Sequence, residues 1–263
     1  MSRRRDILGD VFRNILPLQG FLDNVELKPL HVCIYDAEPE VCLAGLNPAD
    51  LGIDLPAQSR TTLASICAAT MEIAEDGPLR KVLPAKAHGM DAVQYAAALT
   101  LFTMEEPFPF YKLVTKPLNV AGVRDRGSLR RQACYFKLLL TSIRLVPRDS
   151  EFWCNDVLHR GLSIEGSPLL RAKYDDYRNA FSPGTRITFA APTSATTDEA
   201  AAAAFEGGIR YVIQGATPDC GPGGVRLDAG VSVYDEKEVL LDAPQVLTLV
   251  NQDTVATDLG LYI

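Results

Sequence analysis

The sequence predicts an α+β protein, with helices in the first half of the chain and short antiparallel strands in the second. With 263 residues, 47% of them hydrophobic, the chain is long enough to bury a sizeable core. Apolar residues recur at helical spacing before about residue 150, and short β-rich runs separated by glycine and proline turns follow, a pattern typical of an antiparallel sandwich or a barrel-like core. We therefore divide the chain into an extension of unknown role at 1–60, a helical lobe at 61–150 and a β-rich core at 151–263, the last two forming one unit.

Three helices are expected in the first half, and each has start or stop signals. Gly77 and Pro78 end the first helix. Asp91 opens the second with a capping-box-like sequence, and Ser128 is expected to cap the third, which Pro147 closes. The elements predicted here are helices at 62–74, 91–102 and 128–146 and, before them, a strand at 29–35.

The second half is predicted to contain six strands and one helix. Thr196 as N-cap and Glu199 three residues later form a capping box, and the alanine run up to Phe205 has high helix propensity. The strands are expected at 156–162, 185–191, 209–214, 225–233, 238–242 and 246–250.

Charge and cysteine content exclude several classes of protein. The chain has 33 acidic and 26 basic residues, so we expect no nucleic-acid partner, and no apolar run reaches the roughly 18 residues that span a bilayer. The arginines at 3–5 are not followed by an apolar signal region, which predicts an intracellular protein without a signal peptide. Six cysteines occur without a Cys-x-x-Cys pair or Cys/His metal spacing, so we expect free thiols and no metal.

Three polar features of the second half carry chemistry. Arg160 ends an apolar strand, and its guanidinium can bind a phosphate or carboxylate as a fork. Hydroxyl side chains at 193–196 follow the next strand. Glu236 and Glu238 stand at i and i+2, so on a strand they share a face, and neighbouring carboxylates can take unlike roles because one raises the pKa of the other. Each feature has a plainer interpretation: an exposed strand edge, a surface arginine before a turn, or, for Thr196, a helix cap.

The order Arg160, Ser194, Glu236-x-Glu238 resembles the R-S-E signature of ADP-ribosyltransferases, and most closely that of the arginine-specific mono-ADP-ribosyltransferases. The resemblance spans about residues 60–252. It implies an ADP-ribosyltransferase-like fold in which a helical N-terminal lobe packs on two antiparallel sheets that form an NAD-binding cleft. Further segments similar to the family lie at 98–103, 111–119 and 136–147 and at Gly184.

The resemblance also implies residue roles. Arg160 would hold the phosphate or adenosine-ribose side of NAD+, Gly161 would let the ligand approach the backbone, and Ser194 would orient the catalytic glutamate. Glu238 would bind the nicotinamide ribose and stabilise the oxocarbenium-like transition state, whereas Glu236 would engage the acceptor guanidinium. The remaining candidates are Thr193 and Phe205 for NAD+ and Tyr234 for the acceptor.

The implied activity is transfer of one ADP-ribose from NAD+ to an arginine of an acceptor protein, with release of nicotinamide. Two alternatives stay open: NAD+ hydrolysis at the same site, and an inactive interaction module of the same fold. The family's Ser-Thr-Ser can be aligned here with Thr193–Ala195 or with Ser194–Thr196. The loop before Glu236 is one residue shorter than is usual in the family.

Overall fold

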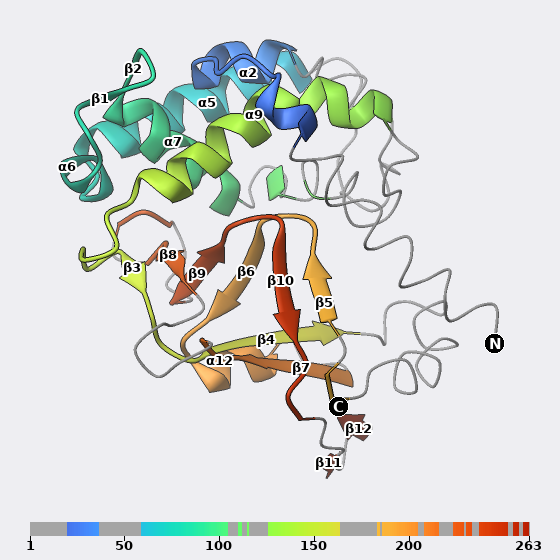
Figure 1. Ribbon diagram of the computed structural model, residues 1–263. Helices are drawn as coiled ribbons and strands as arrows, with labels where there is room; N and C mark the ends of the chain where they lie inside the picture. The colour runs from blue at the N-terminus through green and yellow to red at the C-terminus, as the bar shows by residue number, and fades with distance from the viewer. Residues whose placement is uncertain are drawn as a thin grey trace.

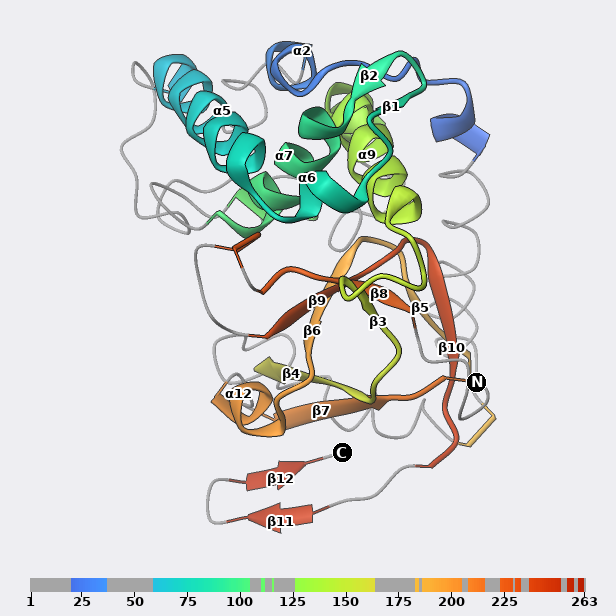
Figure 2. The same cartoon turned by 90° about the vertical axis from the view of Figure 1, so that its left-hand side faces the viewer.

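A layer of helices lies on one side of a set of antiparallel strands (Figure 1). The helices α2 to α9 gather at one end together with β1 and β2, and the strands from β3 onward follow them along the chain and in space (Figure 2). The predicted α+β class is confirmed. The computed structural model describes residues 20–36, 59–104, 110–111, 115, 126–163, 183–184, 186–204, 208–215, 223–228, 230–232, 237–251, 255–257 and 260–262.

Helix α7 is the centre of the helical layer. Ten of its twelve residues are buried, so it is apolar all round rather than on one stripe. It packs against α5 on one side and α9 on the other. The helices of the layer are α2 (Leu30–Asp36), α5 (Ser59–Asp76), α6 (Leu79–Val82), α7 (Ala92–Thr103) and α9 (Arg126–Leu145).

The strand predicted at 29–35 is wrong, because this segment forms helix α2. Leu30, Cys33 and Ile34 are buried, and their spacing of three and four residues places them on one helical face against the core. The carbonyl of Pro29 accepts the amides of Val32 and Cys33, which closes the first turn. Burial of this face outweighs the strand propensity of the β-branched residues in the segment.

The predicted helices at 62–74 and 91–102 are confirmed as α5 and α7, but two details of the helix starts differ. Asp91 occupies the N-cap of α7 without a side-chain capping bond. The Gln94 side chain instead accepts the Leu30 amide at 2.9 Å and so joins α2 to α7. Helix α9 begins at Arg126, two residues before the Ser128 cap that we predicted.

The strands form a six-stranded sheet and three two-stranded ones, and every pair among the described residues is antiparallel. The six-stranded sheet runs in the order β3 (Trp153–Cys154), β8 (Gly224–Arg226), β9 (Glu238–Leu241), β6 (Thr193–Thr196), β4 (Leu158–Ser163), β7 (Gly208–Ile213). The two-stranded sheets are β5 (Arg186–Phe189) with β10 (Gln245–Thr248), β1 (Lys86–Ala87) with β2 (Met90–Asp91), and β11 (Val255–Thr257) with β12 (Gly260–Tyr262).

One feature of the sheet was missed from the sequence. The strand expected at 185–191 ends at Phe189, and the hydroxyl-rich residues that follow form a separate strand, β6, in the middle of the sheet. The short helix α12 (Glu199–Ala204) follows β6 and lies beside β4 (Figure 1).

Strand β9 is buried on both faces. Leu240 packs into the core that the helices share with β8, whereas Val239 and Leu241 pack into a second core with Leu158 and Ile213. Alternate residues of a strand point to opposite faces, so β9 joins the two cores.

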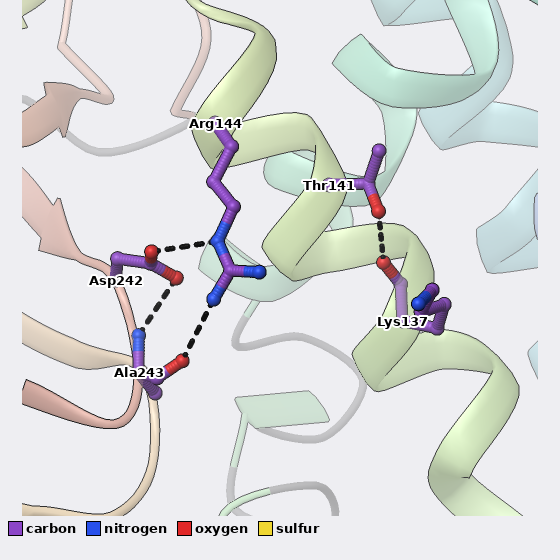
Figure 3. Close-up of polar contacts among 5 residues, drawn as sticks. All are labelled: Lys137, Thr141, Arg144, Asp242 and Ala243. Atoms are coloured by element: carbon purple, nitrogen blue, oxygen red, sulfur yellow. Dashed lines mark hydrogen bonds and ion pairs between the residues drawn. The ribbon is translucent and has the colours of Figure 1, made fainter. Parts of the chain in front are cut away.

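Arg144, in the last turn of α9, links the helical layer to the end of β9 (Figure 3). Its Nε donates to Asp242 Oδ2 at 2.8 Å, and its Nη2 donates to the Ala243 carbonyl at 3.3 Å. The same Asp242 carboxylate accepts the Ala243 amide at 2.8 Å through Oδ1. Because Arg144 and Asp242 are both partly exposed, we expect the ion pair itself to contribute about 1 kcal/mol or less.

Within the described ranges, no helix has both the length and the apolar character needed to cross a membrane. In the same ranges, no group of three or more His, Cys, Asp or Glu side chains could hold a metal ion.

We predict that Leu99→Ala lowers the free energy of unfolding by about 2–5 kcal/mol, because Leu99 is fully buried in α7 and the substitution leaves a cavity. Urea denaturation measures the change. Val250→Ala is the matched control, since Val250 is 85% exposed and its truncation should change stability by less than about 0.5 kcal/mol. Equal losses in the two variants would contradict this packing.

Cys67 predicts a pH dependence of stability. Burial in α5 raises the pKa of this thiol from 9.0 to about 11, because the thiolate is poorly solvated there. The folded-state pKa therefore exceeds the unfolded one, so the stabilisation is fully present below about pH 9 and is lost as the pH rises through about 11. Urea denaturation near neutral pH and near pH 11 should show a larger loss in the natural protein than in Cys67→Ala. An equal loss would contradict the burial of this thiol.

Candidate functional site

The candidate site lies where β4, β6 and β9 run side by side in the middle of the six-stranded sheet. Glu238, the first residue of β9, is paired with Thr196, the last residue of β6. Thr196 is also paired with His159 on β4. Residues paired across antiparallel strands share a face of the sheet, so these three form one row.

Ser194 and Glu238 meet through their side chains. The Ser194 hydroxyl donates to Glu238 Oε1 at 2.5 Å. Ser194 is two residues before Thr196, so it is the diagonal neighbour of Glu238 on the same face, within reach of a glutamate side chain. A hydroxyl that donates to a carboxylate makes a short, charge-assisted bond, which orients the carboxylate.

Arg160 joins this pair through the backbone of Ser194. Its Nη1 donates to the Ser194 carbonyl oxygen, so Ser194 contacts Arg160 through its backbone and Glu238 through its hydroxyl. Burial lowers the pKa of the Arg160 guanidinium, and the nearby Tyr211, Tyr111 and Glu238 oppose this shift. An arginine stays charged despite such a shift, so the site holds a partly desolvated cation close to a carboxylate.

Two tyrosines lie near this guanidinium. Tyr211 is paired with Arg160 across β4 and β7, and its ring meets that of Phe189 edge-on at 5.8 Å. Tyr111 comes from the chain between α7 and α9, with its ring centroid 6.2 Å from that of Phe102. The sequence places Tyr111 in a segment similar to the family, but it offered no signal for Tyr211, whose proximity depends on strand pairing.

The other predicted site residues are placed as follows. Gly161 follows Arg160 on β4 and is paired with Arg210. The Thr193 hydroxyl donates to the Ala191 carbonyl at 2.9 Å, on the strand face opposite to Ser194. The β6 hydroxyl that donates to Glu238 Oε1 at 2.5 Å is that of Ser194, not that of Thr193. The candidates that lie outside the described residues are Phe205, Tyr234 and Glu236.

The predicted capping box of Thr196 and Glu199 is wrong. Helix α12 begins at Glu199, and its N-cap is Asp198, whose Oδ1 accepts the amides of Ala200 at 2.9 Å and Ala201 at 3.2 Å. Thr196 instead accepts the Asp198 amide at 3.0 Å. The carboxylate of Asp198 can accept two amides at once, and this chemistry makes it the better cap.

Asp198 also reaches the strand that carries Glu238. Its Oδ2 lies 2.9 Å from Nζ of Lys237, the residue before Glu238. The hydrogen bond from Lys237 is the largest cause that lowers the pKa of Asp198, and the two helix amides lower it further. The sequence contained Asp198 and Lys237 without any sign that they meet.

The sequence matches no model of a protein family and no curated protein. The structure is similar to the type III effector XopAI from Xanthomonas axonopodis pv. citri, with a TM-score of 0.56 and 12% identity over 99% of this chain and 89% of that one. A 70-residue N-terminal truncation of XopAI gives a TM-score of 0.53 at 11% identity, over 99% and 95% of the two chains. At these identities the likeness shows the fold alone.

Lower TM-scores are found for two enzymes. The ADP-ribosyltransferase HopU1 of Pseudomonas syringae pv. Tomato DC3000 has a TM-score of 0.48 and 17% identity over 74% of this chain and 86% of that one. The ADP-ribosyltransferase Vis in complex with the M6 inhibitor has a TM-score of 0.47 and 12% identity over 75% and 82%.

We predict that Ser194→Ala lowers the free energy of unfolding by about 1–3 kcal/mol, because the charged carboxylate of Glu238 loses a hydrogen-bond donor at a half-buried position. Urea denaturation measures the loss. Thr141→Val is the control, since the Thr141 hydroxyl donates to the Lys137 carbonyl one helical turn back, and its removal should change stability by less than about 0.5 kcal/mol. A Ser194→Ala variant as stable as the natural protein would contradict the contact.

Proposed function

We propose that this protein is a mono-ADP-ribosyltransferase that transfers ADP-ribose from NAD+ to an arginine of an acceptor protein and releases nicotinamide. The observation that carries the proposal is the hydrogen-bonded chain of Arg160, Ser194 and Glu238. These residues come from three strands, and the sequence resemblance singled them out together with Glu236. The α+β fold with a helical layer on antiparallel strands supports the same proposal.

In this proposal Arg160 binds the negatively charged side of NAD+. A guanidinium matches phosphate oxygens with two donors, and partial desolvation strengthens the attraction. Gly161 has no side chain to block the approach of the ligand to β4. Thr193 and Phe205 are proposed to line the NAD+ site as well.

Glu238 is proposed to stabilise the departure of nicotinamide. The bond between ribose C1′ and the nicotinamide nitrogen breaks, and nicotinamide leaves as a neutral molecule with the electron pair. Positive charge develops on the ribose, and a carboxylate fixed beforehand lowers the barrier because it need not reorganise. Ser194 supplies that fixed orientation through its hydroxyl.

The acceptor arginine then attacks C1′. One guanidinium nitrogen forms the new bond and loses a proton, so the overall products are ADP-ribosyl-arginine, nicotinamide and H+. Glu236 is proposed to hold the acceptor guanidinium as a fork and to assist removal of that proton, with Tyr234 beside it. If water attacks C1′ instead, Arg160, Ser194 and Glu238 catalyse NAD+ hydrolysis.

We predict that Glu238→Gln lowers the rate of nicotinamide release by about 10²–10³-fold, because the amide keeps the shape but removes the charge. The assay uses NAD+ labelled in its adenosine half, with an arginine-rich peptide and a lysine-rich peptide as separate acceptors. Glu199→Gln, which changes an exposed glutamate of α12, is the control and should keep the natural rate.

The outcomes separate the alternatives. Absence of nicotinamide release from the natural protein, or release that Glu238→Gln leaves unchanged, would refute the proposed enzyme. Release without label on either peptide would assign NAD+ hydrolysis, and label on the lysine-rich peptide would refute arginine as the acceptor. A thermal shift with NAD+ but no turnover would indicate an interaction module that kept the binding site.

A further inference from the structure

Lys237, the residue directly before Glu238, has an uncommon backbone conformation. Its φ is 48°, in the left-handed region that side chains other than glycine, asparagine and aspartate rarely adopt. Among the described residues, the other non-glycine with positive φ is His88, which lies in the tight turn between β1 and β2. Backbone strain of this kind persists only where the surroundings hold the residue, and it is concentrated at functional sites.

The residues Thr197 and Asp198, which lead from β6 into α12, hold Lys237 at two points. The Thr197 amide donates to the Lys237 carbonyl at 3.4 Å. The Lys237 ammonium lies 2.9 Å from Asp198 Oδ2. Asp198 is itself fixed, because its other oxygen accepts two amides of the first turn of α12. The contact therefore joins the start of a helix to the start of strand β9.

Glu238 is held on its other side as well. Its carbonyl accepts the Leu227 amide at 2.8 Å, and its backbone is paired with Thr196 on β6. The direction in which the chain enters Glu238 is set by the φ of Lys237. That direction decides whether the carboxylate meets the Ser194 hydroxyl at 2.5 Å. The ion pair with Asp198 also occupies the Lys237 ammonium, which would otherwise be a competing partner for the neighbouring Glu238 carboxylate.

We propose that Asp198 and Lys237 are positioning residues whose ion pair keeps Lys237 in its left-handed conformation and thereby sets Glu238 against Ser194. The expected fall in kcat rests on the proposed function, whereas the expected change in the position of Glu238 does not. The ion pair is exposed to solvent, so its loss should change the free energy of unfolding little. Its effect should instead show in the geometry of Glu238.

The kinetic test uses Asp198→Asn. Asparagine keeps an oxygen that can cap α12 but removes the charge that holds Lys237. We expect kcat for nicotinamide release to fall about ten- to a hundredfold, because small displacements of a catalytic group cost this much, while KM for NAD+ stays within about twofold. Glu199→Gln is the matched control, since it removes the neighbouring charge and its 2.6 Å ion pair with Arg210 on the same helix. It should leave both constants unchanged.

A second variant, Lys237→Gly, tests the loss of the ion pair in a backbone that adopts positive φ without strain. Lys237→Gly adopts positive φ without cost but lacks the ammonium, so we expect a kcat as low as that of Asp198→Asn with no loss of stability. The double variant should be no slower than Lys237→Gly alone, because both substitutions remove the same contact. Independent, multiplying losses in the double variant would overturn the proposal.

Amide hydrogen exchange tests the positioning without any catalysis. In Asp198→Asn and in Lys237→Gly, the amides of Thr197 and Leu227 should exchange faster, because they donate to the carbonyls of Lys237 and Glu238. The Arg226 amide, which donates to the Phe152 carbonyl, is the reference and should exchange as in the natural protein.

Two results would overturn the inference: unchanged exchange at both amides in both variants, or, with an active natural protein, a kcat of Asp198→Asn equal to that of Glu199→Gln. If the natural protein releases no nicotinamide but the two amides exchange faster in the variants, the proposed function fails and the positioning of Glu238 by this ion pair stands.

Discussion

The pairing of β6 with β9 is the constraint on which the candidate site depends. Leu240 of β9 faces the core shared with the helices, and Val239 faces the second core. A slip of one residue would turn both side chains to the wrong face, so burial fixes the register. That register places Thr196 opposite Glu238 and makes Ser194 its diagonal neighbour. The precision of the polar contact therefore derives from hydrophobic packing on both sides of one short strand.

The electrostatics of the site follow from its place in the sheet. Arg160 lies on a strand flanked by β6 and β7, and burial lowers its pKa because the charged form loses hydration. The Ser194 carbonyl and the nearby Glu238 compensate for part of that loss. A cation and an anion are thus held close together in a partly dry environment. Such a pair suits the proposed substrate NAD+, which carries negative phosphates and develops positive charge on its ribose.

Polar contacts at the edge of the site tie together parts of the chain that are far apart in sequence. Asp198 caps α12 with one oxygen and binds Lys237 with the other. Arg144 of α9 likewise links a helix to β9, because it donates to the Asp242 carboxylate and to the Ala243 carbonyl just after the strand. Both ends of β9 are therefore attached to helices, and Glu238 stands at one of them. Polar contacts therefore fix both ends of β9, and its pairing with β6 and β8 fixes its place in the sheet.

The sequence by itself determined the class of the fold and the positions of α5 and α7, because helical periodicity is a local property. Its resemblance to the R-S-E signature proposed Arg160, Ser194 and Glu238 as site residues, and hydrogen bonds link these three in the structure. Only the tertiary structure decided that 30–36 is a helix, that Asp198 rather than Thr196 caps α12, and that Tyr211 and Lys237 belong beside the site. Apart from the cap, whose amides belong to residues just after Asp198, these features depend on partners distant in the chain. Burial of one face selects the helix, strand register brings Tyr211 to Arg160, and an ion pair across 39 residues holds Lys237.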